Sequence, residues 1–121
     1  MPRLSVALTC ALLAAFPLAA QDFVAISDKD AFLTLLDGRD LRLGLLGIAL
    51  AVNADGTIIG TASGSDVTGT WVWQAGFFCR EMEWGTTAIP YNCQLVEARG
   101  TEAMRFTVDQ GAGESAVFNL R

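Results

Sequence analysis

The fold of this chain is constrained most by a series of short apolar or alternating runs from residue 46 to the C-terminus, separated by turn residues at regular spacing. Each run has the length of a single strand, and Ala54-Asp55-Gly56 between the first two is a strong hairpin signal. The runs cover residues 46–53, 57–62, 68–74, 77–84, 91–98, 102–108 and 115–121. This pattern predicts a mainly β fold, a small antiparallel meander or barrel of seven or eight strands.

One short amphipathic helix is expected before the strands, within the segment SDKDAFLTLLDG. Ser27 can cap the start of this helix, and Gly38 can end it. Phe32, Leu35 and Leu36 recur at the spacing that places them on one helical face. We expect this apolar face to plug or cover one side of the barrel.

Residues 1–20 have the form of a secretory signal peptide. Arg3 supplies a positive start, an apolar run follows, Pro17 breaks it, and Leu18-Ala19-Ala20 offers small residues for cleavage. The apolar run is too short to cross a membrane, which disfavours a retained anchor. The sequence therefore predicts a periplasmic or secreted protein, with one β-rich domain over residues 21–121 and no membrane span after cleavage.

The balance of charges excludes two classes of partner. The chain has a net charge of −5, and loss of Arg3 with the signal peptide makes it −6. Nucleic acids and anionic membrane surfaces are recognised by clusters of lysine and arginine, which this acidic chain lacks. We expect neither partner.

Cys79 and Cys93 are the two cysteines that remain after cleavage, because Cys10 lies within the signal peptide. An even number of cysteines in an oxidising compartment favours a disulfide. A zinc site would need further ligands and the chain has no histidine, which also removes the usual base of a cysteine nucleophile. The spacing is not C-x-x-C, so a thioredoxin-like centre is disfavoured. The sequence predicts one structural disulfide and no metal site.

Three segments carry a resemblance to a known family: DGTIIGTASGSDVTGTWVWQAGFFCREMEWG, NCQLVEARG and MRFTVDQGAG. They resemble a group of small exported proteins from alphaproteobacteria, of unknown function. The shared pattern is dG-x-i-x-G, G-x-W-x-W, fCR, W-G, NCQ and a late R-F. The likeness covers most of the mature chain, and the pairing of fCR with NCQ is fairly specific.

Members of that group often carry the label dihydrodipicolinate reductase, which implies a dinucleotide-binding fold. This chain lacks a G-x-G-x-x-G turn between a strand and a helix, because GTASGS lies between two expected strands. An exported protein would also lack a supply of reduced nicotinamide. We therefore expect no cofactor and carry over no reductase residue.

Two further features are candidates for ligand or partner binding. Trp71 and Trp73 point to the same side of a strand and can form a stacking platform, although such pairs are more often core packing. The turn Ser63-Gly64-Ser65-Asp66 can present backbone N–H groups as a binding loop, although it is usually only a turn.

Arg80 interrupts an apolar row. Alternation along FFCREMEW places Arg80 on one face of its strand together with Phe78, Met82 and Trp84. A charge in such a row must be paired, reach solvent, or face a polar cavity. One interpretation is an ion pair or backbone-carbonyl contacts that fix the sheet. The other is an anion-recognition point at a pocket rim, with Trp84 or Trp71 beside it.

These features together favour a non-enzymatic binding or interaction module of the periplasm. It would hold a small ligand in the barrel mouth or dock on an envelope protein. A first alternative is an inhibitor of an envelope enzyme that uses the loop of residues 63–66. A second is an enzyme with carboxylate chemistry at Glu81 and Glu83, which share one face of a strand, although such surface acids are usually only solvated.

Overall fold

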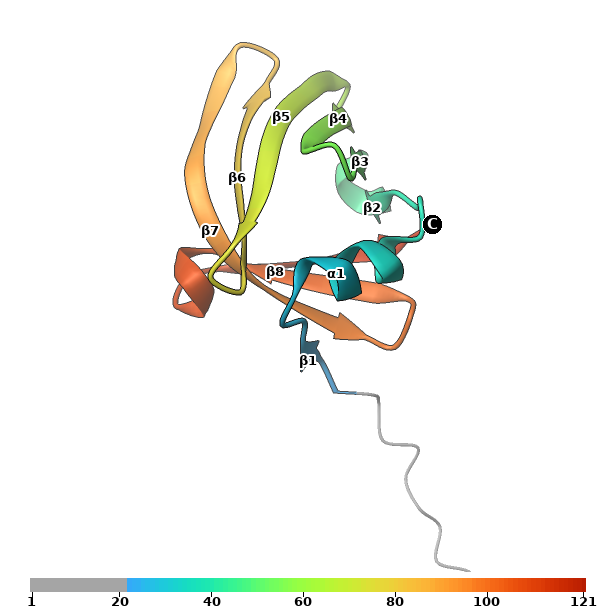
Figure 1. Cartoon of the computed structure of the whole chain (residues 1–121). Helices are drawn as coiled ribbons and strands as arrows, with labels where there is room; N and C mark the ends of the chain where they lie inside the picture. Colours follow the sequence, from blue (N-terminus) through green and yellow to red (C-terminus); the bar gives the residue numbers. More distant parts are fainter. Residues whose placement is uncertain (1–21) are drawn as a thin grey trace, which may run out of the picture.

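The computed structural model describes residues 22–121 and shows a β-barrel with one helix (Figure 1). The predicted signal peptide of residues 1–20 lies outside the described residues. The strands are β1 (Val24–Ala25), β2 (Leu41–Leu43), β3 (Ile48–Val52), β4 (Thr57–Ala62), β5 (Ser65–Gln74), β6 (Phe77–Trp84), β7 (Thr87–Arg99), β8 (Ala103–Thr107) and β9 (Ser115–Leu120). The helix is α1 (Lys29–Leu36), and short 3-10 turns are η1 (Gly44–Leu46) and η2 (Asp109–Gly111).

Strands β2 to β9 form a closed antiparallel ring in which each strand pairs with the next along the chain. The ring closes where β2 pairs with β9, at Leu41↔Leu120 and Arg42↔Asn119. The short β1 lies outside the ring, paired with the end of β7. The prediction of a small antiparallel barrel with an N-terminal helix and one disulfide is therefore confirmed, with eight strands in the ring.

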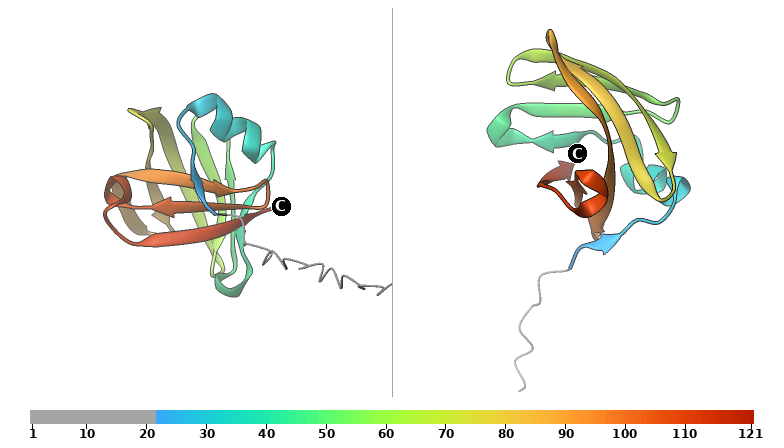
Figure 2. Two further views of the ribbon diagram at one scale, coloured as in Figure 1. Left: turned by 90° about the horizontal axis from the view of Figure 1, so that it is seen from below. Right: turned by 90° about the vertical axis from the view of Figure 1, so that its left-hand side faces the viewer.

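The long strand β7 bends and serves both halves of the barrel (Figure 2). Its first part pairs with β6, and residues 95–99 pair with β8. The register of β6 and β7 shifts between the pairs Arg80↔Asn92 and Met82↔Ile89, so β7 carries an extra residue there. Such a bulge sharpens the bend of a strand.

Gly69 allows β5 and β6 to approach closely at this bend. A Cβ atom on Gly69 would lie 2.5 Å from the carbonyl oxygen of Glu81 and 2.6 Å from Cγ of Met82. Real Cβ atoms do not approach other atoms so closely, and glycine in a strand often marks such a contact. The residue therefore permits the strong curvature of the wall.

Helix α1 begins one residue later than its sequence pattern suggested. Asp28, not Ser27, is the N-cap, and its Oδ1 atom accepts a hydrogen bond from the backbone N–H of Ala31 at 2.8 Å. Asp37 adopts the left-handed conformation that ends the helix, one residue before Gly38. Asp28 takes the cap position because its backbone is already extended and its carboxylate suits the positive helix end.

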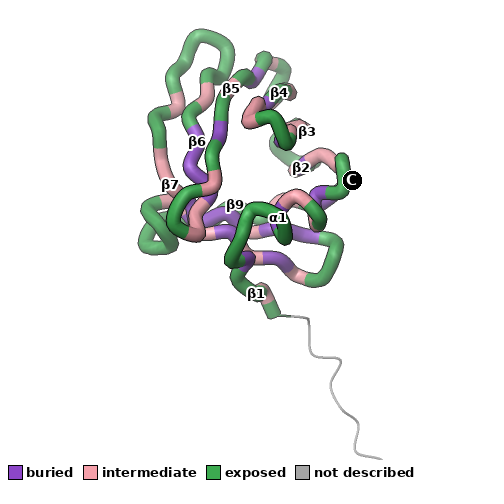
Figure 3. The backbone as a smooth tube through the Cα atoms, in the orientation of Figure 1, coloured by how far each residue is buried: buried purple, intermediate pink, exposed green. Residues whose placement is uncertain are grey.

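Phe32 of α1 joins the helix to the barrel core. Its side chain is fully buried, and its ring lies 5.5 Å from Trp71, 5.2 Å from Trp73 and 5.4 Å from Phe78. Phe106 completes this aromatic cluster. In Figure 3 the tube is coloured as buried along parts of β5 and β6, the strands that carry Trp71 and Phe78. The helix thus fills one end of the barrel, as expected.

The disulfide of Cys79 and Cys93 links β6 to β7, where the two residues are directly opposed. It lies one pair away from Arg80↔Asn92, where the regular register ends. This bond confirms the predicted pairing and fixes the two strands beside the bulge.

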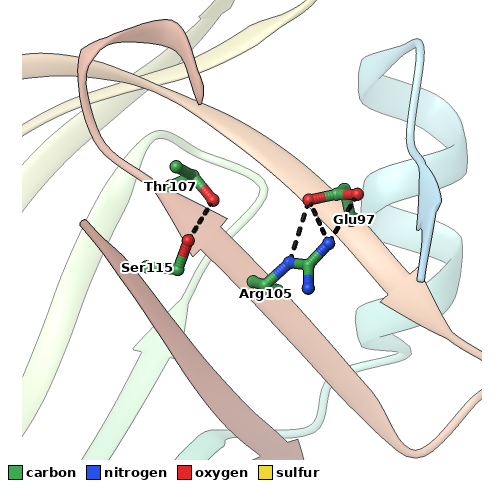
Figure 4. Close-up of polar contacts among 4 residues, drawn as sticks. All are labelled: Glu97, Arg105, Thr107 and Ser115. Carbon is green, nitrogen blue, oxygen red and sulfur yellow. Dashed lines mark hydrogen bonds and ion pairs between the residues drawn. The ribbon is translucent and has the colours of Figure 1, made fainter. Parts of the chain in front are cut away.

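Polar contacts fasten the outer face of β7, β8 and β9 (Figure 4). Arg105 donates two hydrogen bonds to the carboxylate of Glu97, at 3.0 and 2.9 Å. The hydroxyls of Thr107 and Ser115 lie 2.7 Å apart. The Arg105 guanidinium also covers the ring of Phe23, 4.3 Å from its centre. These contacts link the three strands to one another and to Phe23.

Candidate ligand-binding cavity

The barrel encloses a cavity of about 360 Å³ next to its aromatic core. This volume is at the small end of the range typical of ligand pockets. Its walls come from both sides of the barrel and are mostly apolar. The lining residues are Leu41, Leu50, Val52, Ile58, Phe78, Arg80, Met82, Ile89, Gln94, Phe106, Val108, Glu114, Ser115, Ala116 and Phe118.

The cavity is closed at its inner end and opens beside β9. Ile58 and Phe78 are buried, whereas Glu114 and Ala116 are exposed. The adjoining seam between β2 and β9 has only two residue pairs, because β2 is three residues long. In the part of the chain that the structure describes, the first half of β9 therefore has no partner strand on its β2 side, which leaves an entrance to the interior.

Arg80 is the charged side chain on the buried wall of this cavity. It is 8 % exposed, and its Nη1 atom donates a hydrogen bond to the carbonyl oxygen of Pro90 at 2.7 Å. Within residues 22–121, no carboxylate oxygen lies within 4.0 Å of its guanidinium. Burial lowers the pKa of Arg80, yet a guanidinium remains protonated at neutral pH.

The bulge in β7 supplies the single acceptor of Arg80. Pro90 lies in the irregular stretch between the pairs Arg80↔Asn92 and Met82↔Ile89. Proline has no N–H to donate to a sheet, so it is tolerated in strands at such irregularities. Because the bulge leaves Pro90 without a pairing residue on β6, its carbonyl is free to accept from Arg80. One of the two predicted roles of Arg80, a backbone-carbonyl contact, is present in the structure.

Asn92, the cross-strand partner of Arg80, contacts η2 beside the cavity. Its amide donates to Oδ1 of Asp109 at 2.8 Å and accepts from the backbone N–H of Asp109 at 2.9 Å. These two hydrogen bonds hold η2 against β7. Val108, next to η2, is part of the cavity wall, so this contact helps to shape the site.

Gln94 is a second polar residue on the cavity wall, and the sequence interpretation did not include it. It is 8 % exposed and pairs with Phe78 on β6. Asn92 bonds to Asp109 through its side-chain amide, whereas the Gln94 amide makes no hydrogen bond to another described residue. The signal was present in the sequence, because Gln94 alternates with Val96 and Ala98, which are both buried.

None of the three tryptophans predicted as binding residues lines the cavity. Trp71 is the cross-strand neighbour of Arg80, but it is buried in the core, and its Nε1 donates to the carbonyl of Asn53 at 2.8 Å. Trp73 packs on Phe32. The pair therefore serves as core packing and not as an exposed platform. Trp84 is 41 % exposed, outside the cavity lining.

The predicted loop of residues 63–66 is a tight turn. Ser63 and Gly64 have φ angles of 47° and 82°, and Ser65 and Asp66 already belong to β5. The Ser63 hydroxyl donates to the carbonyl of Leu46 at 2.9 Å. The turn is thus fixed against η1, and its serine is engaged within the fold.

Glu81 and Glu83 are both exposed on one face of β6, as the alternation predicted. They line a shallow outer depression with Thr68 and Thr70, away from the buried wall that holds Arg80. Across residues 22–121, no group of three or more potential metal-binding side chains is found. None of the helices in that range is long and apolar enough to cross a membrane.

No family model, curated protein or solved structure matches this chain.

Proposed function

We propose that the protein is a non-enzymatic binding module of the periplasm that holds a small, mainly apolar ligand inside its barrel. The observation that carries this proposal is the cavity of about 360 Å³ with its apolar walls and its opening beside β9. Water in such a cavity makes few hydrogen bonds, so its replacement by apolar groups is favourable.

The cavity sets the size of the ligand. Its volume corresponds to roughly a dozen water molecules at about 30 Å³ each. A ligand with a comparable number of non-hydrogen atoms would fill it, and a larger one would extend through the opening. The predicted signal peptide and the Cys79–Cys93 bond support an exported location, where a thiol pair remains oxidised.

A neutral fluorescent probe, N-phenyl-1-naphthylamine, tests the proposal directly. We expect a saturable rise in its fluorescence on addition of the protein, because the probe leaves water for an apolar site. Ala116→Trp should abolish this signal, because Ala116 lines the entrance.

Val117→Trp is the matched control on the same strand. Val117 pairs with Arg105 on the outer face of the barrel, so its enlargement leaves the cavity unchanged. The proposal is wrong if the wild-type protein gives no saturable signal, or if both variants bind the probe as the wild type does.

The envelope-enzyme inhibitor remains a second candidate, favoured by exposed apolar residues around the turn of residues 63–66. Leu45 is 98 % exposed and Leu46 55 %, next to the Ser63 contact. Trp84 is also exposed, and its Nε1 donates to the carbonyl of Ala62, the residue before Ser63, at 2.7 Å. An envelope hydrolase inhibited by the wild type and not by Leu45→Ser would support this function. Equal inhibition by both proteins would contradict it.

A further inference from the structure

The unused hydrogen-bonding capacity of Arg80 indicates what kind of ligand the cavity takes. A guanidinium carries several N–H donors in a planar fork, and Arg80 uses only Nη1 toward the protein. Its Nε and Nη2 atoms have no acceptor among the described residues and are not sealed off from the cavity space. A buried cation is unfavourable unless an anion or acceptors compensate it.

Three less buried arginines find acceptors within the fold, whereas buried Arg80 uses only one of its donor atoms. Arg39 donates to three backbone carbonyls, those of Leu36, Thr101 and Leu35. Arg42 pairs with Asp40, and Arg105 pairs with Glu97. Arg80 is the most buried of the described arginines, it lines the cavity, and part of its donor capacity is unused by the described residues.

Arg80 and Gln94 can both reach one head group. Arg80 on β6 pairs with Asn92 on β7, and Gln94 lies two residues after Asn92 on the same face of β7. Such diagonal neighbours in antiparallel strands have Cβ atoms roughly 7–8 Å apart. A carboxylate between them could accept from the guanidinium fork and from the Gln94 amide. The remaining walls are mostly apolar and include Phe106 and Phe118.

The charge of the cavity limits the charge of the ligand. Arg80 is the one basic residue among the lining residues, and exposed Glu114 stands at the entrance. A monoanion would neutralise Arg80, whereas a dianion would leave excess negative charge in apolar surroundings. A neutral ligand would leave the guanidinium without compensation.

We propose that the cavity binds an amphipathic monocarboxylate, with its carboxylate at the unused donors of Arg80 beside Gln94 and its apolar chain toward the opening. This inference rests on the proposed function, because it identifies the ligand of the same cavity. The planar fork of an arginine suits the two oxygens of a carboxylate.

Displacement of the neutral naphthylamine probe separates the two proposals. Decanoate, decanol, decylamine and decyl phosphate share one chain length and differ in head group. At concentrations below micelle formation, we expect decanoate to displace the probe from wild-type protein at roughly ten- to hundred-fold lower concentration than decanol. Decylamine and decyl phosphate should be weaker than decanoate.

Arg80→Met keeps the side-chain volume and deletes the charge. It should lose the preference for decanoate over decanol. Arg80→Lys should keep part of the preference, because a charge remains without the fork. Arg42→Met is the control, since Arg42 lies on the surface in a pair with Asp40, and it should behave as wild type.

Each outcome decides between the proposals. Probe binding without a decanoate preference in the wild-type protein would overturn the carboxylate inference and leave the cavity function intact. A preference for decyl phosphate would also overturn it, as would a preference that persists in Arg80→Met. Absence of probe binding would remove the proposed function itself. The wild-type comparison alone is sufficient if a variant does not fold.

Discussion

At the scale of single residues, Arg80 is held by one carbonyl group and by no carboxylate of residues 22–121. We expect Arg80→Met to leave the free energy of unfolding of the ligand-free protein unchanged, or to raise it by up to about 2 kcal/mol. The reason is that replacing a poorly compensated buried charge with an apolar group of similar volume is often stabilising. Urea denaturation followed by tryptophan fluorescence measures the effect. A loss of about 3 kcal/mol or more would instead identify a structural ion-pair role.

Asp55 is a residue whose ionisation is linked to stability. A hydrogen bond from the Thr57 hydroxyl, at 2.7 Å, and a second from its backbone N–H lower the pKa of Asp55 below its usual 3.8. A carboxylate with a lowered pKa stabilises the folded state at pH values above its unfolded pKa. This stabilisation is lost as the pH falls through the lowered value.

Thr57→Val should therefore raise the pKa of Asp55 toward 3.8, because the largest cause of the shift is the hydroxyl. Carboxyl NMR titration of both proteins measures the two values directly. The stability difference between them should be present at neutral pH and shrink below about pH 4. Identical titration curves would show that the hydroxyl contact is not formed in solution.

Residue patterns predicted the position of Arg80 but not its partners. Alternation along β6 placed Phe78, Arg80 and Met82 on one face, and all three line the cavity. The acceptor is Pro90, whose carbonyl is available because of a bulge that no alternation pattern reveals. Gln94 was not predicted, although an amide in a buried row carries the same kind of signal as a charge.

At the scale of strands, close packing at Gly69 controls the curvature of β5 and β6. Gly69→Ala should lower the free energy of unfolding by about 1–3 kcal/mol, because the new Cβ would overlap the Glu81 carbonyl and Met82. Thermal or urea unfolding measures this loss. Gly44→Ala is the control, since a Cβ there meets no atom within 4 Å, and it should have little effect. Equal effects of the two changes would contradict this packing argument.

The disulfide between β6 and β7 makes a measurable contribution to the free energy of unfolding. Replacement of both Cys79 and Cys93 by alanine should cost roughly 2–5 kcal/mol, because the bond restricts the unfolded chain across a sequence separation of 14. Denaturant titration of the double variant checks the value. Thiol titration of unfolded, unreduced mature protein should find no free thiol. Two reactive thiols in protein taken from the periplasm would refute the pairing.

The strands that sequence could predict are those with a complete alternating or apolar run. Each of the seven predicted runs overlaps one strand of the barrel, although β5 and β7 begin three and four residues before their predicted runs. The strands β1 and β2 were not predicted, because they have two and three residues and are too short to show a period. The helix was predicted, but its cap was placed at Ser27 because Ser and Asp both suit that position.

At the scale of the whole molecule, the order of strands followed from the short turns, but closure of the ring did not. Turns of a few residues force consecutive strands to pair, which predicts a meander. Whether the meander closes depends on β2, which has no sequence signature, and on its pairing with the far end of the chain. The cavity exists only because the ring closes, so it could not be predicted either.

The seam between β2 and β9 also has a consequence for how the chain reaches this structure. It joins residues 41–42 to residues 119–120, whereas the other seams of the ring join consecutive strands. Contacts between distant parts of a chain form late, because their loop-closure entropy must first be overcome. Until then, two unpaired strand edges are open to other chains. We expect the refolding yield to fall as protein concentration rises, measured by light scattering after dilution from urea, and a concentration-independent yield would contradict late closure.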